Sequence, residues 1–208
     1  MRVSDAVSTG FTYSFEDDPA DDANDFSDAV LRVSTVGQDA VTGSTLQAQG
    51  QSELLDLRTL TGQTNATFTV NREADFDDII GFYRVFDQNG GIDTNNDGTV
   101  DILTGAAGYT DAAIRNRVSE LSVADQQTAT FAGQLTGGAI FAPFIIADGT
   151  VDQVLNGQNL NQVYFPFLGA SADQADHIRL LGNNTFGFED LPSGGDRDFN
   201  DIIVQITI

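Results

Sequence analysis

The same acidic pattern occurs twice in this chain, once toward each end. Residues 15–33 read FEDDPADDANDFSDAVLRV and residues 188–206 read FEDLPSGGDRDFNDIIVQI, and the two align without a gap. In each copy, carboxylates crowd around a turn that contains proline or glycine, and an apolar strand pattern follows at once. Unpaired carboxylates repel one another, whereas oxygen-rich loops are what Ca²⁺ selects. The repeat therefore predicts calcium-binding turns next to strands.

A shortened third copy lies at residues 73–80, which read EADFDDII. All three copies share the unit Asp-Phe-x-Asp directly before an apolar run. In an extended chain, residues three apart face opposite sides, so both aspartates reach one ion only if the chain bends and the phenylalanine anchors in the core. The alternative is a charged turn whose aspartates cap backbone N–H groups. The predicted calcium ligands in the three copies are Glu16, Asp17, Asp22, Asn24, Asp25, Asp28, Glu73, Asp75, Asp77, Asp78, Glu189, Asp190, Asp196, Asp198 and Asp201.

Residues 93–101, DTNNDGTVD, match the first three-quarters of an EF-hand calcium loop. The twelfth position of the loop holds Thr104 instead of the usual bidentate Glu, so another carboxylate has to complete the site, and Asp87 is the candidate. The alternative is a hairpin built from Asx turns. The predicted ligands within the loop are Asp93, Asn95, Asp97, Thr99 through its carbonyl, and Asp101.

The acidic residues are clustered along the chain. The formal net charge is −22, and twenty of the 31 acidic residues lie in four segments that together hold 49 residues: 15–28, 73–78, 87–101 and 188–201. Clustering favours metal sites over general solvation. The same charge repels nucleic acids and anionic membranes, and no run of about 18 apolar residues predicts a membrane span. We therefore expect neither nucleic-acid binding nor membrane insertion.

Alternating apolar residues and frequent turn residues predict an all-β protein. Only residues 111–121 look helical, with Thr110 as a candidate N-cap. We expect one calcium-binding antiparallel β-sandwich of jelly-roll type over residues 1–208, excised from a larger protein. The predicted strands are 66–70, 79–86 as a central strand, 139–147 and 163–168 with a proline each that indicates an edge or bulge, 177–181, and the apolar runs after the two end repeats.

The sequence lacks the residues and motifs that most known catalytic sites require. It has no cysteine, and no GxSxG, HExxH or P-loop sequence. Its single histidine, His177, stands beside an apolar strand, where a packed or surface histidine is expected. Paired carboxylates would suit glycoside hydrolysis, but calcium explains them better, since a metal-bound carboxylate is a poor general acid. We expect that the chain is not an enzyme.

Three stretches carry a family resemblance: HIRLLGNNTFGFEDLPSGGDRDFNDIIVQITI, GFYRVFDQNGGIDTNNDGTVDILTGAAGY and GGAIFAPFIIADGT. They resemble a domain family of formally unknown function that occurs in cyanobacterial and marine hemolysin-type (RTX) calcium-binding proteins and in RTX adhesins. The resemblance covers roughly residues 60–208. It implies a secreted or cell-surface β-sandwich module, loaded with several Ca²⁺ ions and exported by type I secretion within a larger protein.

In related adhesins, modules at the outer end bind sugars or peptides on other cells. The resemblance therefore implies a monomeric, calcium-dependent module of an RTX-type adhesin that binds an extracellular peptide or glycan ligand. The absence of Trp and the scarcity of Tyr weaken the case for a glycan platform. A Ca²⁺ ion with an open position could instead bind a ligand's carboxylate, which Arg84, Arg115 or Arg179 could help to hold. The alternative is a calcium-rigidified structural module with no ligand of its own.

Overall fold

The computed structural model describes residues 2–6, 10–15, 29–34, 53–74 and 76–208, and in the first three ranges it describes the backbone only. The chain divides into two compact units, Met1–Ala40 and Val41–Ile208. The expectation of one domain over residues 1–208 stays a prediction.

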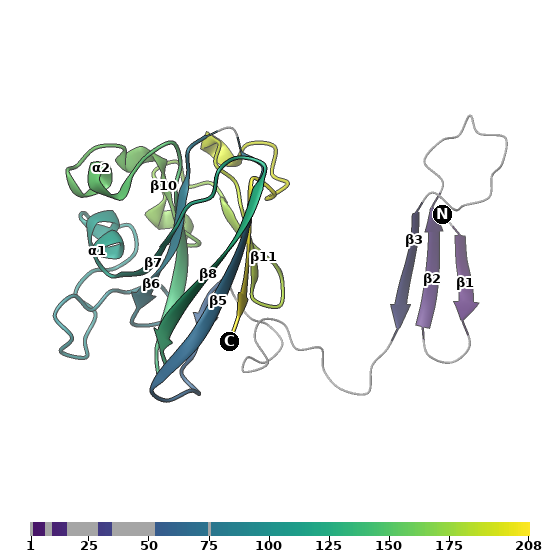
Figure 1. The fold of residues 1–208 in the computed structure, drawn as a ribbon, viewed down its shortest axis with the longest axis horizontal. Coiled ribbons are helices and arrows are strands. Elements are labelled where there is room, and N and C mark those ends of the chain that lie inside the picture. The colour runs from purple at the N-terminus through teal and green to yellow at the C-terminus, as the bar shows by residue number, and fades with distance from the viewer. Residues whose placement is uncertain (1, 7–9, 16–28, 35–52, 75) are drawn as a thin grey trace. The chain divides into compact units, whose positions relative to one another are not determined.

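The first unit is a three-stranded antiparallel sheet in the order β1-β2-β3 (Figure 1). Its strands are β1 (Arg2–Ala6), β2 (Gly10–Phe15) and β3 (Ala29–Ser34). Tyr13 pairs with Val3 on one side and with Leu31 on the other. The first acidic repeat joins β2 to β3, and β3 begins directly after Asp28, as the apolar run predicted.

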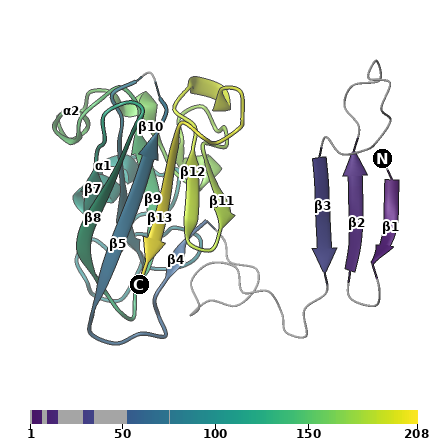
Figure 2. The ribbon, with the colours of Figure 1, turned by 45° about the vertical axis from the view of Figure 1, so that its right-hand side comes forward.

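The second unit is a sandwich of two antiparallel sheets (Figures 1 and 2). One sheet has the order β10-β9-β6-β7, with β4 also paired to β9. The other has the order β11-β12-β13-β5-β8. The strands of the first sheet are β4 (Leu55–Asp56), β6 (Ile79–Val85), β7 (Arg117–Leu121), β9 (Ile140–Ile146) and β10 (Val163–Tyr164). Those of the second are β5 (Gln63–Arg72), β8 (Gln127–Thr136), β11 (Ile178–Gly182), β12 (Thr185–Phe188) and β13 (Ile202–Thr207). The predicted all-β sandwich is confirmed.

Aromatic side chains fill the space between the two sheets. Phe82 of β6 contacts Phe68 of β5 and Phe186 of β12, with ring centroids 5.8 and 5.5 Å apart. On β13, the alternate residues Ile202, Val204 and Ile206 are buried in this core, as the period-two pattern predicted. Burying a large apolar side chain contributes about 1.5–3 kcal/mol, so this core supplies the main stabilisation of the sandwich.

Two short helices, α1 (Tyr109–Arg115) and α2 (Val151–Leu155), cover the outer face of the sheet that contains β6 and β9 (Figure 1). Tyr83 and Val85 of β6 pack into this second cluster, whereas Ile80 and Phe82 face the core between the sheets. Strand β6 is therefore covered on both faces. This double burial explains its nearly continuous apolar sequence and confirms the predicted central strand.

Several local predictions were wrong. The helix α1 begins at Tyr109 after the N-cap Gly108, so Thr110 lies inside its first turn and is not the N-cap. The strand predicted over 163–168 is limited to β10, Val163–Tyr164. The expected helix over 111–121 ends at Arg115, and residues 117–121 form β7, where Val118 and Leu121 lie in a strand paired to β6. Strand β9 is not an edge despite Pro143. It pairs with β6 along its length, and on its other side Pro143 lies between the short pairings of β9 with β4 and β10. None of the described helices is long and apolar enough to cross a membrane.

Candidate metal centre

Two copies of the acidic motif meet at one end of the sandwich. Strand β5 pairs with β13, where Arg72 lies opposite Ile202, and Glu73 N–H donates to the Asp201 carbonyl at 2.8 Å. From there the chain crosses to the other sheet and enters β6 directly after Asp78. The crossover brings the short motif copy, with its last aspartate, beside the C-terminal copy.

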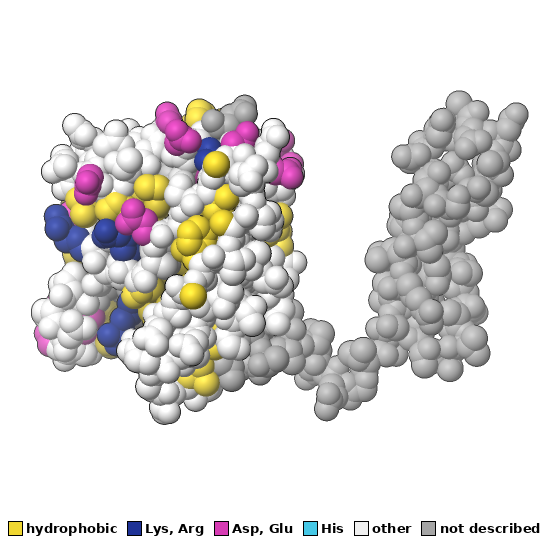
Figure 3. Space-filling view, viewed as in Figure 1, with side chains coloured by type: hydrophobic (Ala, Val, Ile, Leu, Met, Phe, Trp, Pro, Cys, Tyr) yellow, Lys and Arg dark blue, Asp and Glu magenta, His cyan; other side chains and the backbone are white. Residues whose placement is uncertain are grey.

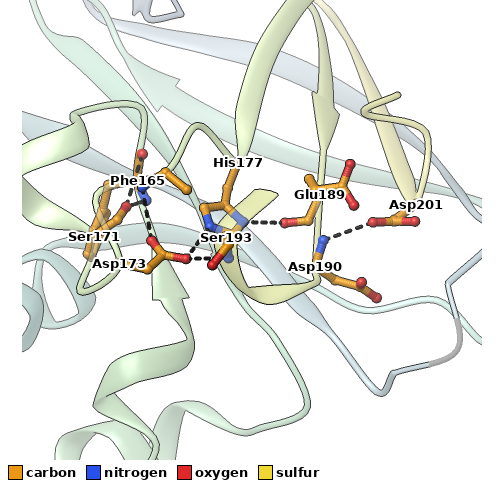
Figure 4. A network of polar contacts seen from close by, with 9 residues as sticks. Phe165, Ser171, Asp173, His177, Glu189, Asp190, Ser193 and Asp201 are labelled. Carbon is orange, nitrogen blue, oxygen red and sulfur yellow. Dashed lines mark hydrogen bonds and ion pairs between the residues drawn. The ribbon is translucent and has the colours of Figure 1, made fainter. Parts of the chain in front are cut away.

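The carboxylates of Glu189, Asp190 and Asp201 form the centre of this cluster (Figure 4). One carboxylate oxygen from each lies within 4.8 Å of the other two. Glu189 and Asp190 follow β12 and are 1% and 4% exposed, whereas Asp201 precedes β13 and is half-buried. The Asp190 backbone N–H donates to Asp201 Oδ2 at 2.8 Å, which fixes the two motif segments against each other.

Asp78, which is itself buried, adds a fourth carboxylate from the side of the opposite sheet. It is 1% exposed, and its Oδ1 accepts a hydrogen bond from Asp148 N–H at 3.2 Å. Burial raises the pKa of Asp78 to about 6, against the lowering effects of that hydrogen bond and of the Arg72 charge. The nearby charge of Asp201 raises the pKa of Asp78 further. The cluster thus contains carboxylates from segments that adjoin both sheets of the sandwich.

Burial and mutual repulsion act on the other carboxylates as well. Burial raises the pKa values of Glu189 and Asp190, and the charge of Asp201 raises both further. The charge of Asp78 also raises the pKa of Asp190. Removing carboxylates from water disfavours their charged form, and neighbouring carboxylates disfavour it again. This arrangement suits a cation bound among the four groups.

Two oxygens in this cluster have no hydrogen-bond partner although they are buried. They are Asp78 Oδ2 and Glu189 Oε1. Burying an unpaired polar group costs roughly 1–3 kcal/mol, more for a charged one. A cation coordinated by these oxygens would remove that cost. All the donor atoms here are oxygens, which is the donor set that a hard divalent cation prefers.

Arg72 is the buried positive charge beside the cluster and was not predicted as part of it. Its side chain is 4% exposed and ends 3.5 Å from Asp77 Oδ1. The guanidinium donates to the carbonyls of Val123, Ala74 and Phe76. Arg72 carries one positive charge and faces four carboxylates, so it neutralises only part of the cluster. An arginine that ends a strand directly before an acidic motif is the sequence signal that could have found it.

The predicted bend in the motif is present in the C-terminal copy. Phe199 has a left-handed φ of 58° and is 1% exposed, so its ring lies in the interior while the chain turns. The guanidinium carbon of Arg179 lies 3.9 Å from the centre of that ring. In the short copy, Phe76 is only half-buried, so the expected anchor is not repeated there. Phe76 instead offers its carbonyl to Arg72.

A second acidic group surrounds the same Glu189. Asp196 and Asp198, both exposed, each place a carboxylate oxygen within 4.8 Å of a Glu189 oxygen. Arg197 N–H donates to Glu189 Oε2 at 3.0 Å. The 3₁₀ turn Pro192–Gly194 starts this loop, which lies where acidic side chains gather at the upper end of the sandwich (Figure 3).

His177 connects the end of β12 to the acidic loop through hydrogen bonds (Figure 4). It is fully buried, its Nδ1 donates to the Glu189 carbonyl at 2.8 Å, and its Nε2 lies 2.9 Å from Asp173 Oδ2. Its ring stacks on Tyr164 at a centroid distance of 3.5 Å. Asp173 Oδ2 also accepts from Ser193 N–H at 2.8 Å. The histidine is therefore a packed residue that holds the end of β12, which was one of the two roles expected for it.

The EF-hand-like loop forms a compact turn closed by the bridge between Ile92 and Ile102. Asp93 accepts from Asn96 N–H at 2.6 Å and from Gly98 N–H at 2.9 Å. Asp101 Oδ2 accepts from the backbone and the hydroxyl of Thr94 at 2.8 and 2.7 Å. The loop thus shows the Asx-turn hydrogen bonding that was its alternative interpretation, and calcium binding by Asp93, Asn95, Asp97, Thr99 and Asp101 stays a prediction.

The remaining predicted ligands fall into two sets. Asp87 caps its own turn, because its Oδ1 accepts from Asn89 and Gly91 N–H groups. Glu73 and Asp77 are exposed and do not belong to the convergent groups found among the described residues. Seven further predicted ligands lie outside the described residues: Glu16, Asp17, Asp22, Asn24, Asp25, Asp28 and Asp75.

Comparison with known proteins identifies one domain. Residues 135–208 match the model of a family described as Domain of unknown function (DUF4114). The match runs from the end of β8 to the last residue and contains Glu189, Asp190 and Asp201, whereas Asp78 precedes it. No curated protein and no solved structure matches the chain.

Proposed function

We propose that this chain is a calcium-stabilised β-sandwich module of a secreted or cell-surface protein of the RTX type. The observation that carries the proposal is the buried cluster in which Asp78 from one sheet meets Glu189, Asp190 and Asp201 from the other. A cation bound there joins the two sheets at one end. Its function is to hold the module in one conformation outside the cell, where the chain has no disulfide for that purpose.

Calcium fits this cluster better than magnesium does. Mg²⁺ keeps several of its waters in most protein sites, whereas Ca²⁺ takes six to eight oxygen ligands in flexible geometry. Asp78, Glu189 and Asp190 are at most 4% exposed, so little space remains for retained water. Bidentate carboxylates and nearby carbonyls would complete the coordination of the larger ion.

The sharpest test compares two neighbouring aspartates. Asp78→Asn removes a buried carboxylate from the cluster, whereas Asp77→Asn changes a fully exposed one that ends 3.5 Å from Arg72. Calcium titration by calorimetry and native mass spectrometry should show that Asp78→Asn loses one tightly bound ion. Asp77→Asn should keep it. Equal calcium binding by the wild type and Asp78→Asn would contradict the proposal.

A ligand-binding adhesion module is the second candidate function, and one feature favours it. A hollow of about 150 Å³ beside the EF-hand-like loop is lined by Arg84, Phe86, Asp93 and Asn96, among others. Arg84 is exposed and forms no side-chain ion pair with any described residue, while Phe86 is 46% exposed. A calcium ion in the loop and the Arg84 guanidinium would together attract a carboxylate on a peptide or glycan.

Peptide and glycan arrays, each probed in Ca²⁺ and in EDTA, test this second function. We expect ligands that bind only in Ca²⁺ and that an Arg84→Gln variant no longer binds. Arg58→Gln serves as the control, since Arg58 is an exposed arginine paired with Asp56 and is not a candidate for ligand binding. If no ligand binds at high protein concentration, the structural role stands without the adhesive one.

A further inference from the structure

Glu189 belongs to both convergent acidic groups of the described chain. In one group its carboxylate lies with Asp190 and Asp201, and in the other with Asp196 and Asp198. The group with Asp190 and Asp201 lies largely buried at one end of the sandwich. Asp196 and Asp198 of the other group lie on the exposed loop around Phe199. The Glu189 side chain therefore stands between an inner and an outer set of carboxylates.

The Glu189 carboxylate has the free capacity that a bridging ligand needs. An ionised carboxylate offers about four acceptor positions on two oxygens. One position on Oε2 accepts the Arg197 N–H, and Oε1 has no partner although it is buried. This unpartnered oxygen on a side chain that is 1% exposed is independent of the acidity of the loop, and it points to a bound cation.

The loop backbone is shaped around that oxygen. Gly195 has φ +39°, and a Cβ built on it would lie 2.0 Å from Glu189 Oε1. Only a residue without a side chain lets the loop pass so close to the carboxylate. The close approach keeps the backbone that carries Asp196 next to the free oxygen.

Charge balance also favours a second ion. The two groups and Asp78 together hold six carboxylates: Asp78, Glu189, Asp190, Asp196, Asp198 and Asp201. One divalent cation and the buried Arg72 leave a substantial excess of negative charge in a small volume. A second divalent cation would remove most of that excess, and divalent cations are often the largest local charges in such a site.

We propose that Glu189 bridges two divalent cations, an inner one held with Asp190, Asp201 and Asp78, and an outer one held with Asp196 and Asp198. The proposal rests on the proposed function for its inner ion and adds the outer one. The outer ion has exposed ligands, so it keeps water in its open positions and binds more weakly than the inner ion. It then orders the loop over the buried one.

Manganese is a suitable probe because Mn²⁺ accepts the same oxygen ligands and is paramagnetic. Two Mn²⁺ ions that share one carboxylate give an exchange-coupled signal in electron paramagnetic resonance. We expect this signal in the Mn²⁺-loaded wild type and its loss in the double variant Asp196→Asn with Asp198→Asn. Native mass spectrometry in calcium should show one ion fewer for that double variant and two fewer for Glu189→Gln.

A matched control is the double variant Asp125→Asn with Asp152→Asn, which changes two exposed aspartates outside both groups. It should keep the wild-type stoichiometry and the coupled signal. If Glu189→Gln and Asp78→Asn each lose one ion and the Asp196/Asp198 variant loses none, the inner site exists and the bridge is refuted. If neither Asp78→Asn nor Glu189→Gln loses an ion, the proposed function fails together with the bridge.

Discussion

Gly195 controls how closely the acidic loop approaches the buried cluster. Its φ of +39° and the 2.0 Å separation between its missing Cβ and Glu189 Oε1 leave no room for a side chain. Gly195→Ala must therefore displace the Glu189 carboxylate or the loop. We expect a fall in calcium affinity of at least about tenfold, since second-shell disturbances of metal ligands typically cost 10–100-fold. Calorimetric titration with Ca²⁺ measures it.

Gly138 is the matched control for that substitution. It also has a left-handed φ, +80°, but no atom lies within 4 Å of the position of its missing Cβ. Gly138→Ala carries the conformational cost of a side chain at positive φ, about 1–2 kcal/mol, without touching the cluster. Gly138→Ala should therefore lower the melting temperature and leave calcium affinity unchanged. Equal affinity losses in the two variants would contradict the role of Gly195.

At the scale of elements, the crossover 73–78 links the sheets through the cluster. The Glu73 backbone N–H donates a hydrogen bond to the Asp201 carbonyl, directly before β13, and Asp78 directly precedes β6. If a cation occupies the cluster, its removal leaves the buried carboxylates to repel one another there, whereas the long pairing of β5 with β8 should stay intact. We expect chelation to lower hydrogen-exchange protection by at least tenfold at the ends of β6, β12 and β13.

Exchange measured by mass spectrometry, with and without chelator, resolves this effect along the chain. Peptides from the middle of β8 serve as the internal reference. A uniform loss of protection over all strands would show that the cation acts on global stability alone. No change in any peptide would show that the cluster binds no structural ion.

The EF-hand-like loop makes a different prediction, because it lies on the surface and away from the sheets' shared core. Asp97 is exposed, and its Oδ1 accepts hydrogen bonds from the backbone and hydroxyl of Thr99. If the loop binds calcium as its sequence predicts, Asp97→Ala lowers the calcium stoichiometry by one and barely changes the melting temperature. Asp5→Ala is the control with unchanged stoichiometry. Native mass spectrometry decides between calcium binding and a simple Asx-turn hairpin.

Individual strands could be predicted from the sequence more accurately than the long-range contacts between them. Strict alternation on β5 and β13 and the apolar run of β6 led to correct strands, because one face or both faces of each are buried. The helix α2 was missed although Thr150 and Gln153 form a capping box. Residues 117–121 were misassigned because a short alternating strand directly after a helix continues an apolar pattern of similar spacing.

The composition of the candidate site could be predicted only in part. Glu189, Asp190 and Asp201 were expected to act together, since one motif holds all three. That Asp78 joins them depends on how β5 pairs with β13, a contact between residues more than 120 positions apart. Local patterns do not encode such a pairing. The same holds for Arg72, whose charge becomes relevant only once the crossover folds beside the cluster.

At the scale of the whole molecule, bound calcium should control the stability of the strongly acidic sandwich. A site held at 100 times its dissociation constant contributes about 2.7 kcal/mol. For a unit of this size, 1 kcal/mol shifts the melting temperature by about 2–4 °C. We expect the melting temperature to fall by about 5–10 °C per lost site when EDTA replaces millimolar Ca²⁺. Scanning calorimetry measures it, and a fall of less than about 2 °C would refute calcium stabilisation.

The metal-free protein should respond to pH in the opposite sense to the calcium-loaded one. Burial raises the folded-state pKa of Asp78 from 3.8 to about 6, so between these values the folded state binds more protons than the unfolded state. Stability of the metal-free form is therefore greatest below about pH 4 with respect to this group, and is lost as the pH rises through about 6. Bound Ca²⁺ requires ionised carboxylates, so the loaded form gains stability over the same range.

Urea unfolding of protein stripped of metal, at pH 5 and at pH 7.5, tests this reversal. We expect the Asp78 contribution to lower the stability of the metal-free form by about 1–1.5 kcal/mol between the two pH values. The Asp78→Asn variant should show a smaller decrease, because its side chain does not ionise, whereas Asp77→Asn should behave like the wild type. A metal-free protein more stable at pH 7.5 than at pH 5 would show that burial and repulsion do not dominate this cluster, and the cation would then have no electrostatic cost to relieve.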